Sequence, residues 1–258
     1  MAEKYWVPAI EKASRVLNEI AQNPNQLRLV DISKSLSINK SSLFSLLHTL
    51  EALGWVTKEK GDAYTLGPAI GALSAAYFSQ FNILQSFYKE AASSVAKINE
   101  HIQLGILEDG NVVYLGKMEG DSRVRLITDP GMRFPAYASA IGKMQLSQYT
   151  HSELTAIYPS GELEPKTPFT MTTVEDLYQN IQLAKKNGFA IENQEASEGF
   201  HCVAAPIYNY EKKMIAAVSF TIMTINWEQK KEEAKEEILN LSHRLSKHAG
   251  YTVPTNTK

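Results

Sequence analysis

The chain has 258 residues, which is enough for one large domain or two smaller domains that each bury a core. Hydrophobic residues make up 44% of it and charged residues 21%, proportions that are ordinary for a soluble globular protein. No apolar run approaches the roughly 18 residues of a membrane helix, and the first ten residues do not have the pattern of a secretory signal. The single cysteine, Cys202, excludes an internal disulfide, so we expect a cytoplasmic protein with no membrane partner.

The formal net charge of −2 excludes a polycation, so bulk charge gives no argument for binding to nucleic acid. Between residues 27 and 60 there are five basic and three acidic residues, a small local excess of positive charge. If this segment binds DNA, its contacts with phosphates therefore come from a few placed side chains and from backbone amides.

The N-terminal part predicts two helices that are followed by a turn. Apolar residues recur at three- and four-residue steps over residues 7–21, which indicates a helix that the sequence Asn-Pro-Asn at 23–25 ends. A short extended segment at residues 27–29 follows, and a second, brief helix opens at Asp31 or Ser33 and ends near Leu36.

A third helix and a hairpin complete the N-terminal pattern. Asn39 is the expected N-cap of a helix that runs to about Leu53, and Gly54 ends it. Two short strands, at residues 55–57 and 63–66, then flank a polar turn. Helix, short helix, turn, helix and hairpin form the plan of a winged helix-turn-helix.

The third helix has two different faces when its residues are placed at about 100° intervals. Leucines occupy one side and are expected to pack on the first two helices. The opposite side, with Ser41, Phe44, Ser45 and His48, is compact and without carboxylates, which suits the major groove of DNA. The ring of Phe44 either packs against the hairpin or meets a thymine methyl group. The candidate DNA-binding residues are Arg28, Asn39, Lys40, Ser41, Ser42, Phe44, Ser45, His48, Lys58 and Lys60.

Residues 68–80 are rich in Ala, Gly and Ser, with Ile70, Leu73 and Tyr77 on one helical stripe. Such a helix either packs on its own domain or pairs with its twin in a second copy. We expect a homodimer, because winged domains usually act as dimers on two half-sites, and the pairing of dimers into tetramers stays open.

The C-terminal part predicts an antiparallel sheet with helices before and after it, which is an α+β layer fold. The helices are expected at residues 81–99, 140–146, 174–187 and 227–248. The strands are expected at residues 101–107, 111–115, 123–127, 202–208 and 214–221. We expect a DNA-binding domain at residues 1–67, a linker helix at 68–80 and an effector domain at 81–258.

Several segments closely resemble the IclR family of bacterial transcriptional regulators. They are VPAIEKA at 7–13, SINKSS at 37–42, LLHTLEALGW at 46–55, YTLGP at 64–68, PGMRFPAYASAIGK at 130–143, NGFAIENQE at 187–195 and GFHCVAAP at 199–206. The resemblance covers nearly the whole chain. It implies a winged helix-turn-helix, a GAF-like effector domain, operator DNA as a partner and control by a small molecule.

The resemblance also implies where the effector binds. The residues it points to are Ser139, Ala140, Ile141, Gly142, Glu192, Cys202, Ser219 and Thr221. A helix that begins near Ser139 presents unpaired amides, which suit a carboxylate, and Ser219 and Thr221 share one face of a strand. Since a carboxylate beside Glu192 would be repelled, we expect a ligand with a hydroxyl-bearing end: a hydroxy, keto or sugar acid.

The chain departs from the family pattern at a few positions. Ser45 stands where an arginine is common, which removes a usual DNA contact and leaves the operator preference open. Glu192 stands where aspartate is frequent, and Ile141 replaces a smaller residue. A common Ser-Gly-Pro ending of the last strand is Thr-Ile-Met at 221–223. The effector is therefore expected to differ in shape from the commonest small keto acids.

Two other functions compete with a metabolite-controlled regulator, which we expect to be a repressor. An enzyme would use Cys202 as a nucleophile, or His201 and Cys202 as metal ligands, but adjacent strand residues diverge and a metal needs three or four ligands. We therefore expect no enzyme, cofactor or metal. A regulator that acts through protein contacts alone is the other alternative.

Overall fold

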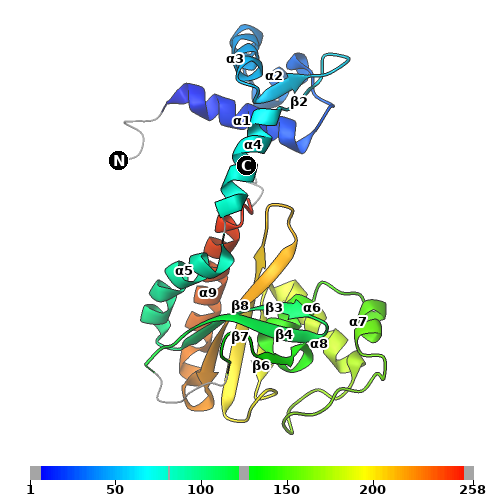
Figure 1. Cartoon of the computed structure of the whole chain (residues 1–258), viewed down its shortest axis with the longest axis vertical. Coiled ribbons are helices and arrows are strands. Elements are labelled where there is room, and N and C mark those ends of the chain that lie inside the picture. Colours follow the sequence, from blue (N-terminus) through cyan, green and yellow to red (C-terminus); the bar gives the residue numbers. More distant parts are fainter. Residues whose placement is uncertain (1–6, 81, 122–127, 253–258) are drawn as a thin grey trace. The chain divides into compact units, whose positions relative to one another are not determined.

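The computed structural model describes residues 7–80, 82–121 and 128–252 of the chain, without the side chains of residues 75 and 77–80. The chain divides into two compact units, residues 1–80 and 81–258 (Figure 1). Each unit has its own buried apolar core, and each is described by itself below. The roles expected for three segments stay predictions: a DNA-binding domain at residues 1–67, a linker helix at 68–80 and an effector domain at 81–258.

The first unit contains four helices and a hairpin within the described residues. In chain order they are α1 (Pro8–Gln22), α2 (Leu29–Leu36), α3 (Lys40–Ala52), β1 (Val56–Lys58), β2 (Tyr64–Leu66) and α4 (Pro68–Gln80). The two strands pair antiparallel, with Thr57 opposite Thr65. The core lies where α1, α2 and α3 meet the hairpin, and Ile20, Ile32 and Leu43 are fully buried in it. The sequence pattern of a winged helix-turn-helix is thus present in three dimensions.

Local signals explain most helix boundaries in this unit. Asn39 is the N-cap of α3, because its side chain accepts a hydrogen bond from the Ser42 amide at 2.8 Å. Gly54 follows α3 at a positive φ of 70°, which only glycine adopts at little cost. The prediction for α2 was wrong by a few residues. Asp31 does not open this helix but lies in its first turn, where its carboxylate accepts from the Arg28 amide at 3.0 Å.

The second unit is built on one sheet with six strands in the order β5-β4-β3-β8-β7-β6, and all neighbouring strands are antiparallel. The strands are β3 (His101–Glu108), β4 (Asn111–Met118), β5 (Arg133–Pro135), β6 (Ala190–Asn193), β7 (Phe200–Tyr208) and β8 (Met214–Met223). The helices are α5 (Ile83–Ile98), η2 (Ala136–Ala138), α6 (Ala140–Leu146), α7 (His151–Ile157), α8 (Val174–Asn187) and α9 (Thr224–His248).

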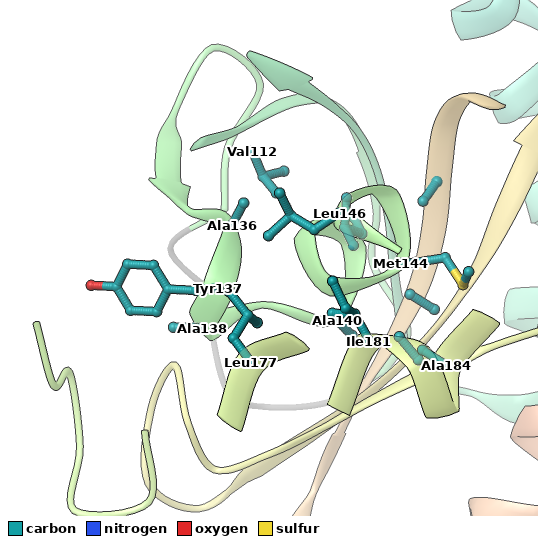
Figure 2. Packing of buried hydrophobic residues seen from close by; sticks show 14 of the residues in the cluster. Val112, Ala136, Tyr137, Ala138, Ala140, Met144, Leu146, Leu177, Ile181 and Ala184 are labelled. Carbon is teal, nitrogen blue, oxygen red and sulfur yellow. The ribbon is translucent and has the colours of Figure 1, made fainter. Parts of the chain in front are cut away.

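Helices cover both faces of this sheet (Figure 1). α5 and α9 pack on one face, where Val203, Val218 and Phe220 are fully buried against them. α6, α7 and α8 lie on the other face, with η2 at the start of α6. Figure 2 shows the buried side chains of this second core, among them Ala136 and Leu177. The expected α+β layer fold is therefore correct.

The sequence patterns found the short helix α6 but missed other short elements of this unit. β5, β6 and α7 have no more than seven residues each and were not predicted. α8 agrees with its prediction at both ends, because the Thr173 side chain caps the Asp176 amide at 3.1 Å and Gly188 takes a φ of 77° after the last turn. The strand expected at residues 123–127 lies outside the described residues.

Gly142 fixes how α6 meets η2. A Cβ atom at this position would overlap the backbone of Ala136, so only glycine permits this close approach. The side chain of Ser139 caps α6 by accepting from the Gly142 amide at 3.0 Å. These two contacts hold the first turn of α6 in place at the edge of the cavity described next.

Candidate functional site

The helix α3 has the two faces that its sequence predicted. Leu43, Leu47 and Leu50 are buried, whereas Leu46 is only partly buried. On the opposite side Phe44 is 62% exposed, and its ring stacks on that of His48 with 6.4 Å between centroids and 6° between planes. An exposed aromatic pair on a helix without a described partner is available for an intermolecular contact.

The small polar side chains of α3 bond within the helix. Ser41 donates to the side chain of Asn39 at 3.1 Å, and Ser45 donates to the carbonyl of Ser41 at 3.2 Å. Ser42 is half-buried and lies off the exposed face. The hydroxyl protons of Ser41 and Ser45 are therefore already bonded in the free protein.

The predicted phosphate contacts lie at the start of α2, the start of α3 and the hairpin. Arg28, Lys40 and Lys60 are exposed, as is Lys58. Lys58 pairs with Asp62 at 2.7 Å, and this hydrogen bond raises the pKa of the lysine. The pairing offsets part of the positive charge that Lys58 would bring to a phosphate.

The second unit contains a cavity of about 330 Å³ between the sheet and the start of α6. This is the size of a site for a small molecule. The residues that line it are Gln103, Tyr114, Thr128, Phe134, Ser139, Ala140, Ile141, Glu192, Ala196, Ser197, Phe200, Cys202, Ser219 and Thr221. Seven of the eight predicted effector residues are among them, and Gly142 is not.

Gln103 on β3 was missed by the sequence analysis, and it organises one wall of the cavity. Its Oε1 accepts hydrogen bonds from the hydroxyls of Ser219, at 3.1 Å, and Thr221, at 3.0 Å. This fixes the orientation of the carboxamide, so its Nε2 is a donor with a set position. Nε2 is buried and has no hydrogen-bond partner among the described residues. The two hydroxyls thus act through Gln103 rather than as free donors to a ligand.

Glu192 on β6 faces Cys202 across the strand pair and is only 1% exposed. Its Oε1 accepts from the backbone amides of Glu195 and Ala196, whereas its Oε2 is buried without a partner among the described residues. Burial raises the pKa of Glu192 to about 7. The Ala196 amide, the Cys202 thiol and the Lys143 ammonium oppose this, and they lower the pKa by less than burial raises it.

Lys143 is fully buried behind this wall. Its ammonium donates to Oε1 of Glu195 at 2.6 Å, and Oε2 of Glu195 has no partner within the described parts of the chain. Lys143 does not line the cavity, and none of the described lining residues carries a positive charge. An anion in the cavity would therefore be held by N–H donors and not by a direct ion pair with one of these residues.

The start of α6 offers fewer amides than the sequence suggested. Because Ser139 already caps the amide of Gly142, that amide is not available to a ligand. The amides of Ala140 and Ile141 precede the first intrahelical hydrogen bond, and both residues line the cavity. The expected unpaired amides at the start of this helix are thus those of Ala140 and Ile141, without that of Gly142.

The thiol of Cys202 is not an activated nucleophile. Its Sγ lies 3.3 Å from Oγ1 of Thr221, and burial raises the pKa of the thiol well above its ordinary value. His201, the adjacent residue, stacks on Trp227 of α9 on the other side of the sheet, with 4.9 Å between ring centroids. Within the described residues no cluster of His, Cys, Asp and Glu could hold a metal ion.

Family models match most of the chain. The model of the C-terminal part of the bacterial transcriptional regulator IclR matches residues 75–247, and the model of the IclR helix-turn-helix domain matches residues 9–60. The chain belongs to the IclR family. Its motifs had indicated this, and the chain is accordingly a DNA-binding transcriptional regulator and not an enzyme.

Relatives agree with this family over nearly the full length. The HTH-type transcriptional regulator XynR of Escherichia coli (strain K12) is 27% identical over 247 residues, which are 95% of this chain and 98% of XynR. The repressor BlcR of Agobacterium tumefaciens is 25% identical with a TM-score of 0.80, over 96% of this chain and 99% of BlcR. IclR of Thermotoga maritima is 26% identical with a TM-score of 0.62, over 95% of this chain and 99% of the Thermotoga protein.

Among the described helices, none combines the length and the apolar character that crossing a bilayer requires.

Proposed function

We propose that this IclR-family regulator represses transcription by placing α3 in the major groove of operator DNA, and that a small organic acid in the cavity releases it. One observation carries the effector part of this proposal. Nε2 of Gln103, Oγ1 of Thr128 and Oε2 of Glu192 are buried polar atoms without partners in the described structure, and all three residues line one cavity. Native proteins rarely leave such atoms unpaired, so a bound molecule that completes them explains their presence.

The proposed ligand carries a carboxylate or carbonyl oxygen at one end and hydroxyl groups at the other. Gln103 and the amides of Ala140 and Ile141 donate hydrogen bonds, which suits an acceptor oxygen. Glu192 accepts from a ligand hydroxyl when it is ionised and donates to a keto oxygen when it is protonated, and its pKa of about 7 permits both forms. Hydroxy acids, sugar acids and keto acids fit this set of groups.

We propose that the regulator acts as a homodimer in the cytoplasm, where its DNA is. The exposed Leu73, at 59%, and the small residues of α4 support pairing with a second copy. The side chain of Tyr77, which the sequence placed on the same stripe, lies outside the described residues. The repressor BlcR, similar over nearly its whole length, supports the proposed sign of regulation.

DNA binding is tested by fluorescence anisotropy of the full chain on duplexes from its own promoter region, at several salt concentrations. We expect specific binding that weakens with salt, because neutralising phosphates releases counterions. Replacing Lys40 and Lys60 with alanine together should flatten the salt dependence. The double replacement of Lys186 and Lys247 with alanine, at exposed positions of the second unit, removes the same charge and serves as the control. A regulator that acts through protein contacts alone would show no binding in any of these measurements.

Effector binding is tested by the melting temperature of the full chain in a panel of acids: D-gluconate, D-glycerate, glycolate and pyruvate. A ligand that binds the folded state raises the melting temperature. The Ser219→Ala, Thr221→Val double variant releases Gln103 and is expected to reduce the rise. An equal rise in the double variant would place the ligand elsewhere.

A further inference from the structure

The exposed face of α3 has an unusual composition for a DNA-reading surface. Its largest side chain is Phe44, which is 62% exposed and stacks on His48 one turn later. Phe44 lies outside the apolar cluster that α3 forms with the hairpin, in which Val56 and Tyr64 take part. Of the two roles that the sequence left open for Phe44, packing against the hairpin is therefore not the one that the structure shows.

The polar neighbours of Phe44 are poor readers of base edges. Ser45 donates its hydroxyl proton to the carbonyl of Ser41, and Thr49 donates to that of Ser45 at 2.9 Å. Ser41 in turn donates to the Asn39 side chain, which also caps the helix. The hydroxyl oxygens keep acceptor capacity, but their protons point back into the helix, so these side chains offer no free hydroxyl donor to a base edge.

Beside the imidazole of His48, this face presents one apolar ring, that of Phe44. In the major groove the 5-methyl group of thymine is the apolar feature that a side chain can recognise, and the four base pairs differ in whether and where they present it. An exposed phenyl ring beside a thymine methyl removes apolar surface of both from water. The neighbouring Lys40, exposed at the start of the same helix, supplies charge that is complementary to the phosphates.

We propose that Phe44, supported by the stacked ring of His48, reads thymine 5-methyl groups and so determines the operator preference of this regulator. The proposal rests on the DNA binding put forward above. It predicts a half-site with a thymine at the position under Phe44, where recognition depends on the methyl group and not on a hydrogen bond.

The experiment first selects high-affinity duplexes from a random library with the full-length protein. Each thymine of the selected sequence is then replaced in turn by deoxyuridine, which removes the 5-methyl group and leaves the base-pairing groups unchanged. For the wild-type protein, one or two of these replacements are expected to weaken binding about four-fold each, the loss expected for one buried methyl group. In Phe44→Ala the thymine and uracil duplexes are expected to bind equally at those positions.

Two variants serve as controls. Leu53→Ala removes a side chain that is 54% exposed at the end of the same helix, about half a turn around its axis from Phe44, and should keep the uracil effect. Phe44→Leu keeps an apolar side chain, so uracil replacement should still weaken its binding, but by less than for the wild type. Since Phe44 is exposed, both variants at this position should melt like the wild type.

The outcomes separate the two proposals. Methyl readout would be overturned, while DNA binding stands, if no uracil replacement weakens binding to the selected duplexes. It would also be overturned if uracil weakens binding of Phe44→Ala as much as that of the wild type. A library from which no duplex is selected would overturn DNA binding itself, and the exposed Phe44 would then belong to a protein contact.

Discussion

Two buried carboxylates of the second unit, Glu237 and Glu192, are surrounded very differently. Glu237 of α9 accepts hydrogen bonds from Ser94 at 2.6 Å, Lys97 at 3.1 Å and Arg244 at 3.2 Å. Burial raises its pKa, but these three partners together outweigh burial, and the pKa lies below its ordinary value. Glu192 has one oxygen bonded to backbone amides and one without a partner in the described structure, and its pKa rises to about 7.

Glu237 has the surroundings of a structural carboxylate, and Glu192 has those that we propose for a ligand-binding one. The bonds of Glu237 link α5 to α9 and need nothing from outside the protein. Glu192, Gln103 and Thr128 each have a polar atom that forms no hydrogen bond with the described residues. All three residues line the cavity. Completed networks stabilise a fold, whereas incomplete ones are costly unless a ligand completes them.

The largest expected effect comes from breaking the complete network. Glu237→Ala should lower the free energy of unfolding by about 3 kcal/mol, because Lys97 and Arg244 lose their shared partner. Urea denaturation at neutral pH measures this. The control Glu236→Ala removes an exposed carboxylate from the adjacent position and should change the stability by less than about 0.5 kcal/mol. A similar loss in both variants would remove the distinction.

A change of pH should expose the incomplete network. The folded chain holds the Glu192 proton up to about pH 7, whereas an ordinary carboxyl in the unfolded chain releases it near pH 4.5. Between about pH 4.5 and about pH 7 the folded state thus binds more protons than the unfolded state. The stability that the protonated Glu192 contributes is fully present below this pH range and is lost as the pH rises through it. Glu192→Gln cannot titrate. Between about pH 5 and about pH 8 its stability relative to the wild type should therefore rise, by roughly 2 to 3 kcal/mol.

Urea denaturation of both proteins at the two pH values tests this expectation. Glu236→Gln, at an exposed position, should show no such change relative to the wild type. A constant difference between Glu192→Gln and the wild type at both pH values would show that Glu192 is ionised throughout.

The orientation of Gln103 should matter for the ligand more than for the fold. In the Ser219→Ala, Thr221→Val double variant, Oε1 of Gln103 loses both of its donors, and the carboxamide is free to rotate. We expect an acid of the panel that stabilises the wild type to bind about ten-fold more weakly, a loss of about 1.4 kcal/mol. Isothermal titration calorimetry measures this, and Ser246→Ala, a buried hydroxyl that bonds to Ser242 and Tyr208 far from the cavity, is the matched control.

The smallest expected effect concerns the cap of α6. Ser139→Ala removes the acceptor of the Gly142 amide and should cost about 1 kcal/mol of stability, whereas Ser139→Gly should cost only a few tenths. Thermal unfolding without ligand compares the two variants. An alanine variant as stable as the glycine variant would show that the cap contributes little to the position of α6.

Local chemistry explains what the sequence could predict. The boundaries of α3 and α8 follow from side chains within four residues of each helix end, such as Asn39 and Thr173. The early start of α2 was missed because Asp31 suits both an N-cap and the third helical position, and only the Arg28 amide decides between them. Short strands such as β6 carry too few residues for a periodic pattern.

Gln103 shows why the candidate site could be predicted only in part. It bonds to Ser219, which is 116 residues further along the chain, because β3 and β8 are neighbours in the sheet. Nothing near Gln103 in the sequence indicates this pairing, which depends on the order of all six strands. The local signal that could have found it is a polar residue between the apolar Ile102 and Leu104 of the expected strand.

A titration of the protein–DNA complex with the acid measures whether filling the cavity controls DNA binding. The acid of the panel that raises the melting temperature most is added to the complex of the full chain with a fluorescent promoter duplex, for the wild type and for the Ser219→Ala, Thr221→Val variant. We expect the acid to release the duplex from the wild type. Without acid the variant should bind the duplex equally well, but about ten-fold more acid should be needed to release it. Equal release from both proteins, or no release from the wild type at an acid concentration that saturates its melting temperature, would contradict it.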